Sequence, residues 1–180
     1  MMKRFLMIAV VAASLASCKK NVSEPGGENE HEAINSVTLT FSQNGTVAGT
    51  FIAEDPDGDG GAPPTRIDTI RLRNNQNYTA ELTLKNISGT RVTDVTATVR
   101  QQGVNHEIFY VMSGASAAVV KTDMDANNLP IGFNSTWTTG AASSGSVLIK
   151  LMHKPFIKKA GDNPNIGHSD LALAMPIIIQ

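Results

Sequence analysis

Hydrophobic and polar residues alternate with a period of two along most of the chain beyond residue 35, which predicts β-strands rather than helices. Val37, Leu39 and Phe41 begin this pattern, with Ser and Thr between them. It recurs at 47–53, 70–72, 78–84, 95–99, 147–151 and 171–179. Residues 106–112 are apolar on both faces, which is typical of a central strand. Asn44-Gly45 between the first two strands predicts a tight hairpin with a type I′ turn.

The predicted strands are short, rich in Thr and β-branched residues, and separated by Gly, Asn, Asp and Pro. No amphipathic helix is predicted after the N-terminal segment. We therefore predict one all-β domain over residues 35–180, an immunoglobulin-like sandwich of two antiparallel sheets with eight or nine strands. A closed β-barrel is the alternative.

The first 17 residues have the pattern of a signal peptide. Lys3 and Arg4 precede an apolar run from Phe5 to Leu15, which is shorter than the roughly 20 residues of a membrane-spanning helix. Leu15-Ala16-Ser17-Cys18 matches the bacterial lipoprotein box, in which the chain is cut before Cys and the thiol receives a diacylglycerol with acyl chains such as palmitate. We predict a signal peptide at 1–17 and a lipid anchor at Cys18.

Residues 18–34 have the composition of a linker. They contain Pro25, Gly26, Gly27 and four Glu, and they lack apolar periodicity. This composition predicts a flexible, solvated tether between the lipid and the fold. The anchor places the protein in the bacterial cell envelope, on the membrane surface.

Composition removes several classes of function. Hydrophobic residues are 41% and charged residues 17%, which is a globular composition, and a net charge of -1 does not favour nucleic acid. The single Cys lies in the lipoprotein box. A disulfide framework, a cysteine-rich zinc site and thiol catalysis are therefore excluded.

Two acidic runs are candidate calcium sites. Asp55, Asp57 and Asp59 alternate along the chain and are followed by Gly60, as in the first half of a calcium loop. Asp123, Asp125 and Asn127 form a second half-motif. The twelfth position of the first run is Arg66 instead of Glu, which excludes an EF-hand. The alternative is a pair of acidic turns in which Asp and Gly serve the backbone.

The predicted domain has three histidines, His106, His153 and His168, with Glu107 and Asp170 beside two of them. Their spacing lacks the short repeats of metal ligands, and the sequence has no nucleophile elbow or phosphate loop. They are therefore predicted to be ordinary histidines at strand ends.

Several motifs occur together in a fixed order along residues 35–180. They are the Asp55–Pro63 segment, Leu82–Asn86, His106–Tyr110, Leu129–Gly132, Leu148–Pro155 and Gly167–Leu171. In these motifs the chain resembles a family of small lipoproteins of Bacteroidota, often labelled as having a type 1 periplasmic binding fold. The resemblance implies an outer-membrane location. It implies no particular activity, because the family has no established one. That label implies two α/β lobes, whereas the period of two favours the β-sandwich.

These patterns together predict a non-enzymatic, lipid-anchored envelope protein that acts as a structural or ligand-binding accessory. The alternative is a calcium-stabilised surface module that binds a glycan or a protein, and a hydrolase is the third interpretation. Calcium is the one candidate cofactor. The predicted partners are the membrane, through the lipid on Cys18, and an envelope protein or glycan, with no nucleic acid.

Overall fold

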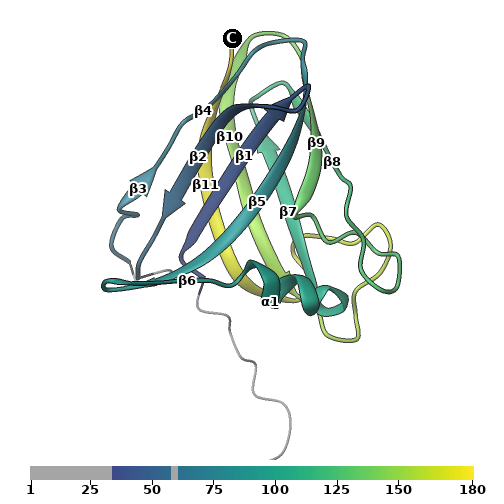
Figure 1. Cartoon of the computed structure of the whole chain (residues 1–180). Helices are drawn as coiled ribbons and strands as arrows, with labels where there is room; N and C mark the ends of the chain where they lie inside the picture. Colours follow the sequence, from purple (N-terminus) through teal and green to yellow (C-terminus); the bar gives the residue numbers. More distant parts are fainter. Residues whose placement is uncertain (1–33, 58–60) are drawn as a thin grey trace, which may run out of the picture. The chain divides into compact units, whose positions relative to one another are not determined.

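The computed structural model describes residues 34–57 and 61–180. Strands make up 57% of the structure, and they form two sheets that pack face to face around one hydrophobic core (Figure 1). The prediction of an all-β sandwich is confirmed. In the part of the chain that is described, the two sheets do not close into a barrel.

The larger sheet has the strand order β3-β2-β1-β5-β9-β8, and β6 pairs with β5. Its strands are β1 (Ser36–Gln43), β2 (Thr46–Glu54), β3 (Arg66–Ile67), β5 (Asn77–Ser88), β6 (Arg91–Asp94), β8 (Ala117–Lys121) and β9 (Asn134–Thr139). The smaller sheet has the order β4-β11-β10-β7. Its strands are β4 (Ile70–Leu72), β7 (His106–Ser113), β10 (Ser143–His153) and β11 (His168–Ile179). All pairs are antiparallel except β4 with β11.

The core forms where the inward faces of the two sheets meet. Val37, Leu39 and Phe41 of β1 are completely buried, as their alternation predicts. Trp137 of β9 packs edge-to-face on Phe41, with ring centroids 5.0 Å apart, and on Tyr110 of β7, with centroids 5.5 Å apart. Because Tyr110 belongs to the smaller sheet, the Trp137 ring joins the two layers.

The hairpin between β1 and β2 is confirmed. Asn44 and Gly45 both have positive φ values, 51° and 78°. A type I′ turn needs positive φ at both central residues, which Asn and Gly adopt with least strain.

The predicted strand at 95–99 is wrong, because this segment forms the short helix α1 (Thr96–Gln101). The Asp94 side chain accepts a hydrogen bond from the Thr96 amide at 2.9 Å, and the Thr96 hydroxyl bonds the backbone of Leu84. These contacts turn the chain away from the sheet. Val95 and Val99 are buried four residues apart, a spacing that also fits a helix.

The segment 106–112 forms a strand, β7, but it lies at the edge of the smaller sheet and not at its centre. Its outward-facing residue Phe109 is nevertheless buried. The ammonium groups of Lys121 and Lys154 lie 4.0 and 4.5 Å from the centre of the Phe109 ring. The apolar pattern on both faces therefore reflects cover by other segments rather than a central position.

Strands β3, β6, β8 and β9 were not predicted, which is why the described structure has more strands than eight or nine. They are short or carry mainly Ser, Thr and Ala, so their alternation is weak. These segments become strands through hydrogen bonding with neighbouring strands: β9 pairs with β5 on one side and with β8 on the other.

The two ends of the sandwich carry different connecting segments. The upper end in Figure 1 carries the β1–β2 hairpin, the turn at 73–77 and the end of β11. The lower end carries α1, the 3-10 turn Gly103–Asn105 and the loop 154–167 between β10 and β11. Within residues 34–57 and 61–180, no helix has the length and hydropathy needed to cross a bilayer.

Candidate functional site

Two arginines at the upper end line a groove on the described surface. Alternation along β4 buries Ile70 and Leu72 in the core and turns Arg71 to solvent. Arg73 follows two residues later and is exposed as well. Both guanidinium groups therefore project from the same side of this segment.

The groove beside them has a volume of about 360 Å³. Arg71 and Arg73 line it together with residues of the β1–β2 hairpin, Gln43, Thr46, Val47 and Ala48, and with Tyr78 and Gln180. This volume lies within the roughly 300–1,000 Å³ of small-ligand sites. Its lining is mostly polar, with Val47 as an exposed hydrophobic residue.

The backbone at Arg73 is fixed by buried side chains. The Arg73 amide donates a hydrogen bond of 3.0 Å to the Tyr78 hydroxyl. The Thr139 hydroxyl donates one of 2.7 Å to the Arg73 carbonyl. Gln43 and Gln76 also bond each other through their side-chain amides at 2.7 Å. The groove is therefore formed before any ligand arrives, which lowers the entropic cost of binding.

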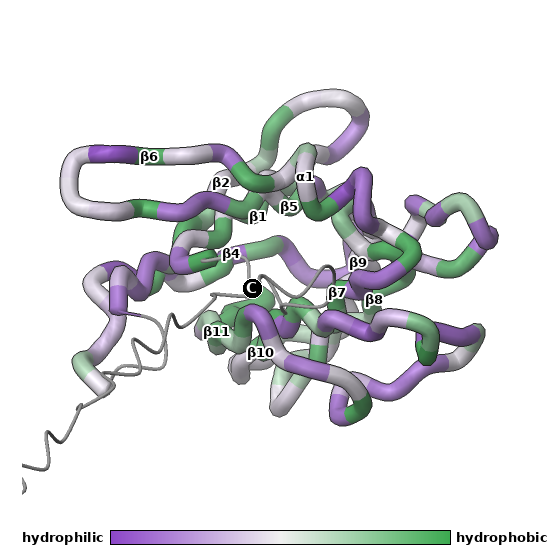
Figure 2. Tube along the Cα trace, turned by 90° about the horizontal axis from the view of Figure 1, so that it is seen from below, coloured by the Kyte–Doolittle hydropathy of each residue, from purple (hydrophilic) through white to green (hydrophobic). Residues whose placement is uncertain are grey.

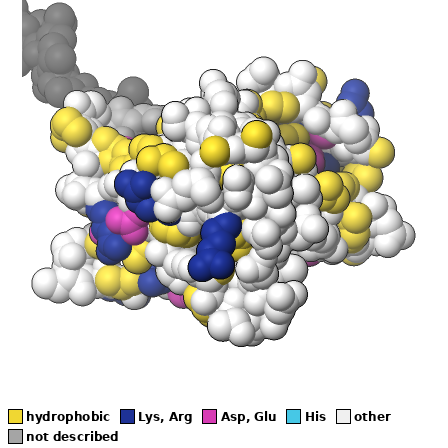
Figure 3. Space-filling view, turned by 90° about the horizontal axis from the view of Figure 1, so that it is seen from above, with side chains coloured by type: hydrophobic (Ala, Val, Ile, Leu, Met, Phe, Trp, Pro, Cys, Tyr) yellow, Lys and Arg dark blue, Asp and Glu magenta, His cyan; other side chains and the backbone are white. Residues whose placement is uncertain are grey.

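The charge at this end is positive. Arg71 and Arg73 make no ion pair with a described acidic residue, in contrast to Arg66, which pairs with Asp68 at 2.9 Å. The connecting segments 43–46, 73–77, 113–117 and 140–143 contain no Asp or Glu. Figure 3 shows this end from above, with dark-blue basic side chains among largely uncharged surface. Two unpaired guanidinium groups suit a carboxylate, sulfate or phosphate.

A second groove, of about 340 Å³, lies on the outer face of the larger sheet. Its lining is rich in hydroxyl and amide groups from β1, β5, β9 and the residue after β8: Thr40, Ser42, Thr79, Asn134, Ser135 and Thr122. Glu81 is its one charged residue. The pattern is that of a solvated β-sheet face, where Thr is common.

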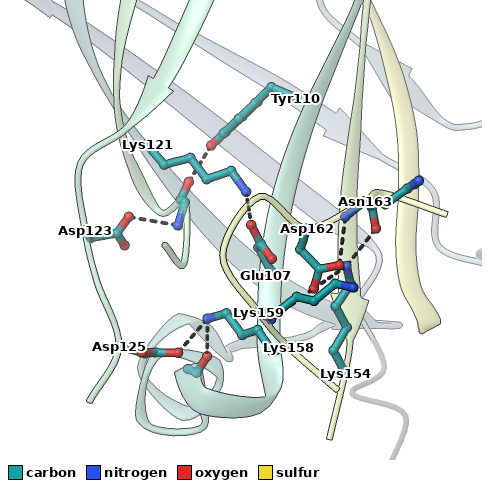
Figure 4. A network of polar contacts seen from close by, with 12 residues as sticks. Glu107, Tyr110, Lys121, Asp123, Asp125, Lys154, Lys158, Lys159, Asp162 and Asn163 are labelled. Atoms are coloured by element: carbon teal, nitrogen blue, oxygen red, sulfur yellow. Dashed lines mark hydrogen bonds and ion pairs between the residues drawn. The ribbon is translucent and has the colours of Figure 1, made fainter. Parts of the chain in front are cut away.

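The lower end contains buried ion pairs (Figure 4). Lys154 lies 3.1 Å from Asp162, and neither side chain is exposed. Lys158 lies 2.8 Å from Asp125, again with both side chains buried. Lys121 pairs with Glu107, and burial lowers the pKa of Lys121. The first pair lies within the loop 154–167, the second joins that loop to the connection between β8 and β9, and the third joins β8 to β7.

The predicted calcium half-motif at 123–127 forms a turn whose carboxylates accept hydrogen bonds from the protein. Asp123 accepts them from the amides of Gly132 at 2.8 Å and Phe133 at 3.0 Å. Asp125 accepts them from the amides of Asn127 at 2.8 Å and Leu129 at 2.9 Å, besides its contact with Lys158. Both carboxylates thus accept backbone amides, and each also has a basic partner, Arg100 for Asp123 and Lys158 for Asp125.

The first acidic run is described in part. The Asp57 carboxylate accepts a hydrogen bond of 3.1 Å from the Ala62 amide, and Asp55 lines a small cavity at the lower end. Asp59 lies outside the described residues, so a calcium site at 55–59 stays a prediction. Among the residues that the structure covers, no group of three or more His, Cys, Asp or Glu side chains is arranged to hold a metal ion.

The three histidines lie closer together than the sequence suggests. Strand register places His153 opposite His106 on one side and opposite His168 on the other. The rings of His106 and His153 stack at 4.8 Å. The His106 Nδ1 atom lies 3.1 Å from the Gln102 carbonyl, and its Nε2 atom 3.4 Å from Asp170. Both nitrogens of the buried His106 ring therefore have protein partners.

Sequence reasoning missed the arginine groove, the buried lysines and the histidine alignment. The one usable signal was the pair of alternating arginines in an acid-free stretch at 69–77. Cys18 lies outside the described residues. Comparison of the chain with protein-family models, curated proteins and solved structures found no match.

Proposed function

We propose that this protein is a non-enzymatic, lipid-anchored accessory of the bacterial outer membrane that binds an acidic ligand in the upper groove. The observation that carries the proposal is the pair Arg71 and Arg73, which line a preformed groove without an acidic partner among the described residues. The ligand class is a carboxylated or sulfated glycan, since a chain of such groups can contact both arginines at once.

The location of the groove supports this assignment. Ile34, where the described chain begins after the predicted tether, lies beside the start of β11 at the lower end. The groove lies beside Gln180, which follows the end of β11. Because β11 is one strand of 12 residues, its two ends are about 40 Å apart. A protein anchored through Cys18 would therefore hold the groove away from the chain's attachment point.

The two arginines of the groove support a binding role in this proposal. Arg71 and Arg73 remain charged at all physiological pH values and position anions rather than transfer protons. The histidines lie at the other end of the smaller sheet, in register with each other.

Binding of defined polymers tests the function. We expect the purified protein to bind polygalacturonate or heparin in calorimetry and not to bind neutral dextran. The affinity for the polyanion should fall as the salt concentration rises. Arg71→Ala should weaken binding about tenfold or more, because a hydrogen bond to a charged group contributes about 1.5–3 kcal/mol. Arg91→Ala removes an exposed arginine from β6 and is the matched control. Equal losses in the two variants, or no binding to either polyanion, would contradict the proposal.

A further inference from the structure

Among the hydrophobic residues exposed at the lower end are Val104, Met124, Phe156 and Ile157. We call these four the apolar patch. Phe156 has a relative exposure of 103%, and Met124 has one of 52%. Large exposed side chains that stand alone are ordinary on protein surfaces, whereas a contiguous group marks a contact surface.

A single buried lysine joins the three segments that carry them. The Lys158 ammonium group donates hydrogen bonds to the Gly103 carbonyl at 2.7 Å and to Asp125 at 2.8 Å. Three segments distant in sequence thus meet at one atom. Val104 follows Gly103, Met124 precedes Asp125, and Ile157 precedes Lys158. Three of the exposed residues are thus direct sequence neighbours of groups that meet at Lys158, and Phe156 is one residue further along the chain.

The loop that presents Phe156 is held in place by lysines. Lys154 bonds the carbonyl of Asn163 at 2.7 Å, and Lys150 bonds that of Pro164 at 2.7 Å (Figure 4 shows the first of these). Phe156 itself has a φ of 64°, a backbone conformation that bulky residues rarely adopt. Such strain persists where the surroundings fix it, and it is concentrated at functional positions.

The patch lies at the same end as the beginning of the described chain. Ile34 and Asn35 line a small cavity with Ser169 and Asp170, which follow the loop 154–167 directly. Figure 2 shows this end from below, with hydrophobic stretches in green on the loops around α1. The 16 residue-to-residue steps from Cys18 to Ile34 can extend at most about 55 Å, at roughly 3.4 Å per step. A lipid on Cys18 therefore keeps this end within reach of its membrane.

The charges around the patch also favour a lipid surface. The carboxylates of Asp125 and Asp162 are buried in lysine ion pairs and present little negative charge to solvent. Lys159, next to Lys158, is exposed. Aromatic and aliphatic side chains flanked by lysine are the composition of segments that rest in the interface of anionic membranes.

We propose that the apolar patch inserts into the interface of the bilayer that carries the lipidated Cys18, with Phe156 as its deepest residue. This inference depends on the lipid anchor of the proposed function. Anchoring makes the contact intramolecular, so that a patch of four side chains suffices although it would bind a membrane weakly alone. The docked patch would orient the sandwich so that the arginine groove faces away from the membrane.

Tryptophan fluorescence of the full-length lipidated protein in vesicles of phosphatidylcholine and phosphatidylglycerol tests this contact. Phe156→Trp places a reporter at a fully exposed site, and the natural Trp137 is completely buried and serves as background. We expect the Phe156→Trp emission to shift to shorter wavelength on vesicles and to be quenched by brominated lipids. Val47→Trp, at an exposed position beside the groove, is the matched control and should show neither change.

Each outcome is informative when flotation with the vesicles is measured in parallel. Protein that floats while Phe156→Trp stays unquenched overturns the patch contact and leaves the anchor intact. Protein that does not float overturns the anchor and, with it, the contact. A blue shift that occurs without vesicles and grows with protein concentration would assign the patch to a second copy of the chain and would overturn the membrane proposal.

Discussion

The ammonium group of Lys158 lies 2.8 Å from a carboxylate oxygen of Asp125, and the exposed fractions of the two side chains are only 2% and 1%. Removing both charges from water is costly, and close contact with further hydrogen bonds offsets that cost. Lys158 also bonds the Gly103 carbonyl, and Asp125 bonds two backbone amides. The pair thus fixes how three segments of the lower end meet.

Breaking this pair from one side should destabilise the fold strongly. Asp125→Leu leaves the Lys158 charge buried without its partner, and we expect a loss of about 3–5 kcal/mol in the free energy of unfolding. The double variant Asp125→Leu/Lys158→Met leaves no unpaired charge and should lose less than Asp125→Leu alone. Urea unfolding of both variants measures the difference. A double variant less stable than the single one would contradict the role of the ion pair.

Acid should reduce the stability that the buried ion pairs give to the lower end. Burial raises the pKa of Asp125, but hydrogen bonds from Lys158 and from the amides of Leu129 and Asn127 outweigh it and hold that pKa below its usual value. Burial likewise raises the pKa of Asp162, but hydrogen bonds from the Asn163 amide and from Lys154 outweigh it and hold that pKa below its usual value. Because the folded pKa values are lower than the unfolded value of about 3.9, the stabilisation is complete well above that pH. It is lost as the pH falls through the folded pKa values.

We therefore expect the urea midpoint to be steady between about pH 5 and 7 with respect to these groups and to fall below about pH 4. The decline should be shallower in Asp125→Leu/Lys158→Met, in which one of the two carboxylates is missing. Equal declines in the two proteins would show that Asp125 does not contribute.

Two glycines should respond differently to alanine. At Gly45 a Cβ atom would meet nothing within 4 Å. Gly45→Ala should therefore lower the free energy of unfolding only by the strain of a φ of 78° in the hairpin, about 1 kcal/mol. At Gly145 a Cβ atom would lie 2.0 Å from the Ser113 carbonyl oxygen, which belongs to the backbone. Gly145→Ala should therefore lower the melting temperature far more than Gly45→Ala. Similar melting temperatures would contradict the close approach of β10 to the turn after β7.

Calcium should stabilise the protein through the first acidic run. Asp55, Asp57 and Asp59 repel one another unless a cation neutralises them. Bound calcium adds about 2.7 kcal/mol at a hundredfold excess over its dissociation constant. We expect the melting temperature to rise in millimolar calcium, less in magnesium, and not at all in Asp57→Ala. Asp123→Asn is the comparison, since its carboxylate already accepts two backbone amides. No shift relative to chelator would identify the run as a turn.

The anchor is tested at Cys18. Cys18→Ser should abolish labelling with a radioactive or clickable fatty acid and release the protein from the membrane fraction. Two or more acyl chains hold a protein stably, whereas none leaves only weak contacts. A Cys18→Ser protein that still carries lipid would contradict the lipoprotein assignment.

Local sequence was sufficient where short-range physics decides the structure. The alternation of Val37, Leu39 and Phe41 set the buried face of β1, because neighbouring residues of a strand point to opposite faces. Asn44-Gly45 determined the hairpin locally as well, because the turn needs positive φ at both positions and few residues adopt it. The all-β class followed from many such repeats.

Tertiary structure decided what depends on partners distant in the chain. Thr96 bonds the backbone of Leu84, and the strand-like pattern that follows forms a helix. The edge strand β7 can carry the outward-facing Phe109 because lysines from two other segments cover that ring. Arg71 became a candidate ligand contact only because the fold places it beside the β1–β2 hairpin, at an end whose turns contain no Asp or Glu. Periodicity reports which way a side chain points, whereas the charge and the cover that it meets are set by segments brought together in folding.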